Sequence, residues 1–121
     1  MKTVLLDSSA LLALVDLKLD AVREVEELIE EPLRFVVLKP CLSELRVVAK
    51  PSAFHVIMRY LQQRGASVAD APQAKADEAI LAFASRNPNC IVATLDARLR
   101  KKLKKEGVQT ITLHGAKLVV T

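Results

Sequence analysis

The sequence predicts an α/β fold, in which helices cover both faces of a short, mainly parallel central sheet of four or five strands. The first reason is that short apolar runs rich in β-branched residues alternate along the chain with segments of helical period. The second is that strands joined through helices usually pair in parallel, by right-handed crossovers. With 121 residues the chain has the length of one domain, so we expect a single domain over residues 1–121.

Five apolar runs have the length and composition of buried strands. They comprise residues 3–6, 35–38, 91–95, 110–113 and 118–120. The last run follows a His114-Gly115 turn, which predicts a final hairpin.

Apolar residues at helical spacing occupy much of the chain between these runs. The expected helices lie near residues 22–29, 41–49, 52–64, 79–84 and 97–105, and one more begins after Asp7. Pro51 separates two of them, because proline suits the first turn of a helix but not its interior. Gly65 and Gly107 are expected to end helices.

The composition excludes several classes of protein. Apolar residues make up 51% of the chain and charged residues 26%, which is typical of a globular domain and excludes disorder. Residues 10–15 form an apolar run of six residues, the greatest length in the chain and far short of a membrane span. Asp7 and Asp16 bracket this run, so we expect no signal peptide and a soluble, cytoplasmic protein without membrane partners.

Cysteine and histidine do not form a metal-binding pattern. Cys41 and Cys90 lie far apart in apolar surroundings, which is typical of buried, reduced thiols. His55 and His114 are also far apart. A metal in this protein would therefore be held by carboxylates, which favour a hard ion such as Mg²⁺ or Mn²⁺.

Positive charge is concentrated in one predicted helix. Six of the eight residues from 98 to 105 are basic, and removing these six charges from the net charge of +4 leaves −2 for the rest of the chain. Four of them share one face at helical spacing, namely Arg98, Lys101, Lys102 and Lys105. Such a helix either binds a polyanion or is simply a solvated face. Only four aromatic residues are present, so base stacking is not expected to drive recognition.

Four acidic residues fall where the predicted topology brings them to one edge of the sheet. Asp7 and Asp96 each follow a predicted strand directly. Glu44 lies in the helix after the second strand, and Asp77 begins a later helix. Ligands of open α/β sheets bind beyond the carboxyl ends of the strands, so this is the edge to examine.

Each acid also has an ordinary explanation. An aspartate at the start of a helix caps it or complements its dipole. Those explanations do not account for four acids at one edge, where like charges repel one another. A bound Mg²⁺ would relieve the repulsion and could hold and activate groups around a phosphodiester. Acids for metal beside bases for a polyanion therefore suggest nucleic-acid chemistry.

Four motifs along the chain, in this order, resemble those of PIN-domain ribonucleases. They are Val4-Leu5-Leu6-Asp7-Ser8-Ser9-Ala10-Leu11-Leu12, Pro40-Cys41-Leu42-Ser43-Glu44-Leu45, Ala76-Asp77-Glu78-Ala79-Ile80 and Val92-Ala93-Thr94-Leu95-Asp96-Ala97-Arg98-Leu99. The resemblance covers nearly the whole chain. Its late section is similar to small archaeal PIN proteins of the ribosomal-RNA-processing kind and to toxin-type PIN nucleases.

The resemblance implies a PIN-like α/β/α sandwich and a Mg²⁺- or Mn²⁺-dependent endoribonuclease. It implies that the catalytic, metal-binding quartet is Asp7, Glu44, Asp77 and Asp96. Thr94 matches a supporting hydroxyl, and Ser9 stands where many members have an asparagine that orients the first aspartate. Leu95 departs from the polar residue found in many members. RNA is the implied partner, and a homodimer, an antitoxin or a ribosome-assembly factor are further partners the resemblance allows.

Other functions fit the residues less well or stay open. A haloacid-dehalogenase-type phosphatase needs an aspartate two residues after the first, where this chain has Ser9. A phosphorelay receiver needs adjacent acids after the first strand and a lysine after a late strand. A module that binds RNA or a ribosome-assembly partner without turnover keeps the acids and stays an alternative, as does a toxin-type nuclease.

Overall fold

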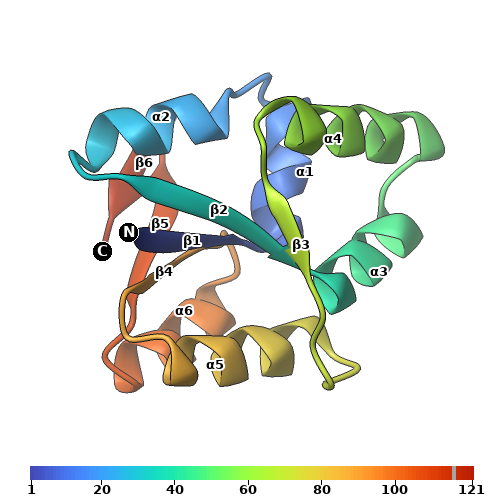
Figure 1. Cartoon of the computed structure of the whole chain (residues 1–121). Coiled ribbons are helices and arrows are strands. Elements are labelled where there is room, and N and C mark those ends of the chain that lie inside the picture. Colours follow the sequence, from blue (N-terminus) through green and yellow to red (C-terminus); the bar gives the residue numbers. More distant parts are fainter. Residues whose placement is uncertain (116) are drawn as a thin grey trace.

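The computed structural model describes residues 1–115 and 117–121 and confirms the predicted α/β fold (Figure 1). In chain order its elements are β1 (Lys2–Leu6), α1 (Ser8–Asp16), α2 (Ala21–Leu28), β2 (Leu33–Leu38), α3 (Lys39–Val48), α4 (Pro51–Gln63), β3 (Ser67–Ala69), α5 (Ala76–Arg86), β4 (Cys90–Ala93), α6 (Ala97–Lys105), β5 (Gln109–His114) and β6 (Lys117–Val120). None of the helices in the described ranges is both long and apolar enough to cross a membrane.

The described strands form one sheet in the order β3-β2-β1-β4-β5-β6. The first five are parallel, and β6 runs antiparallel beside β5 as the predicted hairpin. β1 is central, between β2 and β4, so the chain reverses its direction of winding there. This position is the switch point at which parallel sheets usually bind their ligands.

Two features of the described sheet differ from the sequence prediction. The sheet gains β3, whose three residues are short and mostly exposed, so they form no apolar run that a sequence pattern could reveal. β4 ends at Ala93, so Thr94 and Leu95, which were expected to be strand residues, instead bridge the strand to Asp96. Thr94 N–H still donates to the carbonyl of Ile111 at 3.0 Å, which keeps this bridge against the sheet.

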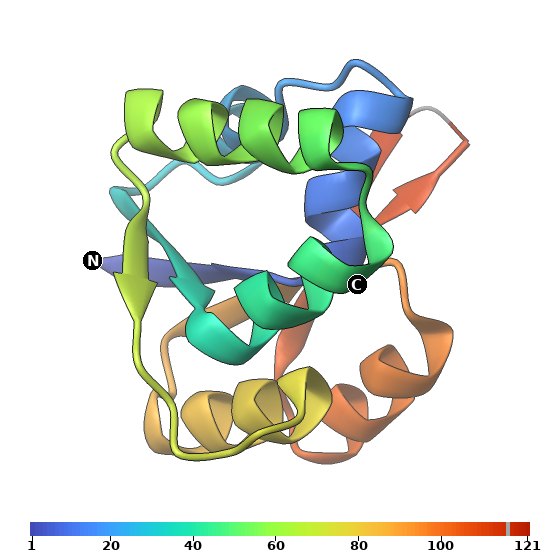
Figure 2. The ribbon, with the colours of Figure 1, turned by 90° about the vertical axis from the view of Figure 1, so that its right-hand side faces the viewer.

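Helices cover both faces of the sheet, and α3 lies at its carboxyl edge. α1, α2 and α4 lie on one side and α5 and α6 on the other (Figure 1). Figure 2 shows α3 between these two layers. The core is made of fully buried aliphatic side chains from strands and helices, among them Leu5, Val37, Ile57, Ile80 and Leu103.

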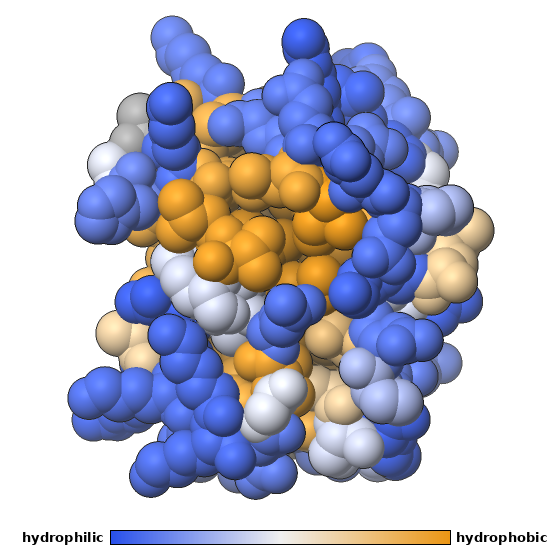
Figure 3. All heavy atoms as spheres, turned by 90° about the vertical axis from the view of Figure 1, so that its left-hand side faces the viewer, coloured by the Kyte–Doolittle hydropathy of each residue, from blue (hydrophilic) through white to orange (hydrophobic). Residues whose placement is uncertain are grey.

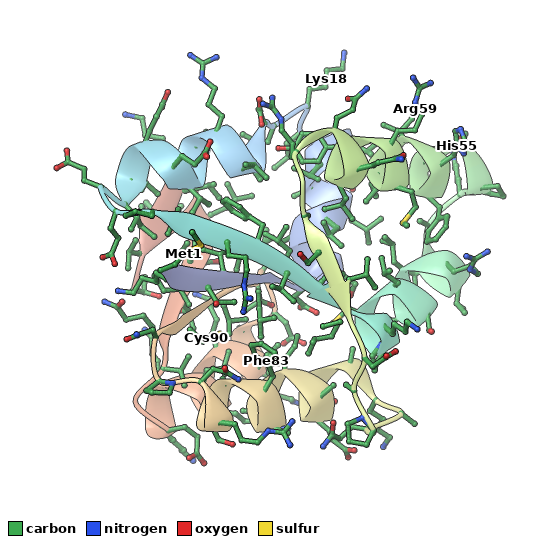
Figure 4. The ribbon with its side chains drawn as sticks, in the orientation of Figure 1. Met1, Lys18, His55, Arg59, Phe83 and Cys90 are labelled. Atoms are coloured by element: carbon green, nitrogen blue, oxygen red, sulfur yellow. The ribbon has the colours of Figure 1, made fainter. Side chains whose placement is uncertain are left out.

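Most apolar side chains of the helices point toward the sheet, and most charged ones point outward. Phe83 lies between α5 and the sheet, whereas His55 and Arg59 extend outward from α4 (Figure 4). The side of the molecule on which both chain ends lie has an apolar patch at its centre, surrounded by hydrophilic residues (Figure 1 and Figure 3). Among the large apolar side chains that the elements on this side leave exposed are Met1, Leu28 and Val120.

Candidate active site

All four predicted acids line one cleft of about 530 Å³ at the carboxyl edge of the sheet. The other lining residues are Pro40, Ser43, Val47, Ala74, Lys75, Ala76 and Leu99. Asp7 comes from the end of β1, Glu44 from α3 and Asp77 from the first turn of α5. Asp96 precedes α6. The edge predicted from strand order is thus where the acids gather.

The structure separates capping from the other roles that these acids could have. Asp96 does cap α6, since its Oδ1 accepts hydrogen bonds from the N–H groups of Arg98 and Leu99 at 2.9 and 3.2 Å. Asp7 stands at the equivalent position before α1, yet its side chain makes no capping bond. Helix capping therefore explains one oxygen of Asp96 and does not explain Asp7.

Asp7 is held by two hydroxyl groups instead. Its side chain is buried, with 5% of the residue exposed. Thr94 Oγ1 donates to Asp7 Oδ2 at 2.7 Å, and Ser9 Oγ donates to the same oxygen at 3.0 Å. These contacts place Ser9 and Thr94 where the sequence predicted supporting hydroxyls.

The same hydroxyls also fix the chain that leads to Asp96. Thr94 Oγ1 accepts the N–H of Asp96 at 3.1 Å, and Ser9 Oγ accepts the N–H of Leu95 at 3.0 Å. Because Leu95 takes part through its backbone, its apolar side chain does not interrupt this network. The network ties the ends of β1 and β4 together across the switch point.

Ser8 is a site residue that the sequence analysis missed. It is buried, and its Oγ donates to Glu44 Oε1 at 2.5 Å. The bond joins the first turn of α1 to α3, across 36 positions of sequence. A serine after Asp7 is visible in the sequence, but its partner is decided by how α3 packs on α1.

Three of the four carboxylates keep an oxygen that the protein does not use. In Asp7 both side-chain hydrogen bonds reach Oδ2, in Glu44 the one bond reaches Oε1, and in Asp96 both reach Oδ1. Among the described residues no hydrogen bond or ion pair engages the second oxygen of these three groups. An all-oxygen donor set of this kind suits a hard divalent ion.

The carboxylates share a cleft without converging on one point. Within residues 1–115 and 117–121, no group of three or more His, Cys, Asp or Glu side chains is placed to hold a metal ion. Glu44 and Asp96 are exposed residues, and each is held by hydrogen bonds through one oxygen only, which leaves the second oxygen free to turn toward an ion. Binding an ion would therefore require rearrangement of these side chains around the fixed Asp7.

Among the described residues, no cysteine or histidine lines the cleft. Burial, together with the negative charges of Asp7 and Glu44, raises the pKa of the Cys41 thiol to about 12, so the thiol stays protonated at neutral pH. Cys90 is also a buried, free thiol. His55 and His114 are exposed on α4 and at the end of β5, and neither lines the cleft. The site is therefore purely one of oxygen ligands.

The basic residues of α6 are arranged in two groups. Lys102 and Lys105 line a second cleft, which lies between α5 and α6 and has a volume of about 530 Å³. Arg98 and Lys101 are exposed and line neither cleft. Lys102 Nζ lies 3.8 Å from Asp77 Oδ2. The predicted basic face therefore reaches the acidic cleft through Lys102.

Comparison with known proteins identifies the architecture. A family model described as a PIN like domain matches residues 4–116. Among solved structures, the fold is similar to that of the PIN domain endonuclease Utp24, with a TM-score of 0.83 over 98% of this chain and 90% of that chain. The two sequences are 16% identical, so the likeness is one of fold. None of the curated proteins compared with the chain matches it.

Proposed function

The chain belongs to the PIN-like domain family, and from this premise we propose that it is a divalent-metal-dependent endoribonuclease that hydrolyses RNA phosphodiester bonds. The proposed catalytic and metal-binding residues are Asp7, Glu44, Asp77 and Asp96. The metal is Mg²⁺ or Mn²⁺, since the donors are oxygen atoms alone. RNA processing is the proposed role.

One observation carries this proposal: the carboxylates of Asp7, Glu44 and Asp96 line one cleft, and each has one oxygen that forms no bond within the described protein. Hydrogen bonds from Ser9 and Thr94 orient Asp7, and a hydrogen bond from Ser8 orients Glu44. The carboxylate of Asp96 is held by two backbone N–H groups of α6. When bound, a divalent ion would activate water and neutralise charge on the phosphate. The protein's part is to hold Asp7 rigidly and to let Glu44 and Asp96 adjust.

Cleavage of labelled RNA tests the proposal. Structured and single-stranded RNAs are incubated with the protein in Mg²⁺, in Mn²⁺ or in EDTA. We expect internal cleavage with either ion and none in EDTA. Asp7→Asn should reduce the rate at least about a hundredfold, because even changes to residues that only orient metal ligands commonly cost tenfold to a hundredfold.

Thermal unfolding separates loss of metal binding from loss of fold. A divalent ion should raise the melting temperature of the natural protein, because it binds only the folded state. Asp7→Asn should keep its metal-free melting temperature and lose most of that rise. Cleavage by Asp7→Asn at the rate of the natural protein would overturn the assignment of Asp7.

A binding role without turnover is the second candidate function. It is favoured by the fact that, in the described residues, the acids do not form a ready-made metal site. In this case the protein would bind RNA or a ribosome-assembly partner in EDTA as well as in Mg²⁺, and no cleavage would appear. A toxin-type nuclease held by an antitoxin would cleave RNA, so the same assay distinguishes it from a binding module. A homodimer and a cytoplasmic location stay predictions.

A further inference from the structure

The acidic cleft and the α5–α6 cleft meet at one ion pair. Asp77 lines the acidic cleft, and Lys102 lines the α5–α6 cleft together with Lys105. The distance from Lys102 Nζ to Asp77 Oδ2 is 3.8 Å. The remaining residues of the α5–α6 cleft are Leu81, Ala82, Ser85 and Glu106. Lys102 therefore stands at the border between a surface suited to cations and a groove with two ammonium groups.

Asp77 differs from the other three acids in that both of its oxygens are engaged. Its Oδ1 accepts the N–H of Glu78 at 2.9 Å, and its Oδ2 faces Lys102. An ammonium group of the protein itself thus lies beside the oxygen that a cation would bind on Asp77. Lysine and a divalent ion are both positive, so they compete for this oxygen.

The ion pair between Lys102 and Asp77 is weak enough to break easily. The side chains of Lys102 and Asp77 are 49% and 44% exposed. Ion pairs of such exposure contribute little, corresponding to a factor of about five at most in an equilibrium constant. Lysine also has a long, flexible stem, and Lys105 lies one helical turn further along the same groove. Lys102 can therefore leave Asp77 and turn toward Lys105 without disturbing the helix.

We propose that Lys102 is an exchangeable counter-ion, which neutralises Asp77 in the metal-free protein and binds an RNA phosphate in the α5–α6 cleft once a divalent ion takes its place. The inference rests on the proposed function, since it needs a metal at the acidic cleft and a polyanionic substrate. Lys105 is the constant member of the phosphate site, and Lys102 is the conditional one. Glu106, at the end of α6, limits the site on its far side.

The first consequence concerns metal affinity in the absence of RNA. Lys102→Gln removes the competing cation, so we expect Mn²⁺ to bind two- to fivefold more tightly, as measured by calorimetric titration of the free protein. The matched control is Lys104→Gln, which makes the same charge change on the same helix at an exposed residue outside both clefts. Equal Mn²⁺ affinities in the two variants would overturn the exchange.

The second consequence concerns RNA and depends on whether metal is present. The probe is a short single-stranded RNA, and a denaturing gel run after each measurement checks that it is still intact. Lys102→Gln should weaken RNA binding severalfold and reduce the salt slope by about 0.7 in Mn²⁺, and should have no effect in EDTA, where Lys102 stays on Asp77. Lys105→Gln should weaken binding in both conditions. An equal effect of Lys102→Gln in Mn²⁺ and EDTA would make Lys102 an ordinary phosphate contact and contradict the inference.

These measurements test the lysine exchange independently of the proposed nuclease activity. If the natural protein cleaves no RNA but Lys102→Gln still shows tighter Mn²⁺ binding and metal-dependent RNA binding, the nuclease proposal is wrong and the exchange stands. If cleavage is present but the two lysine variants behave like the Lys104 control, the exchange is wrong and the nuclease stands. Far-ultraviolet circular dichroism of each variant confirms that the exposed substitutions leave the fold intact.

Discussion

The two side-chain oxygen atoms of Asp96 have different surroundings, so its capping role and its proposed metal-binding role fall on different atoms. Its Oδ1 accepts two backbone N–H groups at the start of α6, while no described group engages its Oδ2. Helix capping is a property that serine shares with aspartate. Serine has no second side-chain oxygen, however, and so it cannot supply the free carboxylate oxygen that Asp96 presents to the acidic cleft. A single substitution can therefore separate the two roles.

We expect Asp96→Ser to keep the fold and lose the chemistry. The serine hydroxyl can cap α6, so the free energy of unfolding should change by less than about 1 kcal/mol. RNA cleavage and the rise in melting temperature with Mn²⁺ should both be lost. Asp96→Ala is the comparison, because it removes the cap as well and should lower stability further. Full cleavage by Asp96→Ser would reduce Asp96 to a capping residue.

The residues of the candidate site differ in how far the sequence alone could predict them. Asp7 and Asp96 follow strands, so the strand-edge rule alone indicated them, although β4 ends two residues before the expected boundary. Glu44 and Asp77 were predicted as site residues from the family resemblance as much as from their positions. Ser8 was not predicted, and Lys102 was predicted only as part of the basic face. Their contacts with Glu44 and Asp77 depend on how helices pack together.

At the scale of elements, a second polar cluster holds α2 to α4 on the side away from the site. Asp20 precedes α2 and accepts the N–H of Arg23 at 3.3 Å, the hydroxyl of Tyr60 at 2.5 Å and an ion pair from Arg64. Burial acts to raise the pKa of Asp20, but the hydrogen bonds from Tyr60 and Arg23 and the charge of Arg64 together lower it below its usual 3.8. Tyr60 also accepts the N–H of Val22 at 3.0 Å.

Removing this cluster should loosen the α2–α4 contact without touching the site. Asp20→Ala loses a helix cap and an acceptor for Tyr60, which together cost about 1–3 kcal/mol. Urea unfolding measures the loss. Asp16→Ala, at the exposed end of α1, is the matched control and should change stability by less than about 0.5 kcal/mol. If the two variants have the same unfolding midpoint, the cluster does not stabilise the packing.

The elements themselves were mostly predictable, because their signals are local. Pro51 and Gly65 mark the ends of α4, and the helix occupies 51–63 where 52–64 was expected. α3 begins at Lys39, two residues early, since Pro40 fits its first turn. β3 was missed because it has neither length nor an apolar run, and it forms only by pairing with β2.

At the scale of the whole molecule, three side chains with raised pKa values make the free energy of unfolding depend on pH in the alkaline range. Burial, followed by the charges of Asp7 and Glu44, raises the pKa of Cys41 from 9.0 to about 12. Burial raises the pKa of Cys90 to about 11. Burial and the hydrogen bond to Asp20 raise the pKa of Tyr60 to about 12. The unfolded chain loses these protons at lower pH than the folded chain does.

Stability should therefore fall as the pH rises above about 9. Between this value and about 12 the folded protein binds more protons than the unfolded chain, so the free energy of unfolding decreases with pH. Cys41→Ala should lower stability at pH 7 through a small cavity, yet show a shallower fall between pH 8.5 and 10.5. Urea midpoints across this range measure the slope. Parallel slopes for the two proteins would contradict a buried, protonated thiol at Cys41.

The long reach of the hydrogen bonds in the site has a consequence for how the protein is made. Thr94 and Asp7 are 87 positions apart, and β1, which is synthesised before the other strands of this sheet, pairs with β4. A ribosome extending this chain thus produces Asp7 long before the threonine that orients it. Until residue 96 has left the exit tunnel the cleft lacks one wall, and its first aspartate lacks one of its hydroxyl partners. Whatever chemistry the cleft performs is therefore withheld from the growing chain until β4 and Thr94 have been added beside β1.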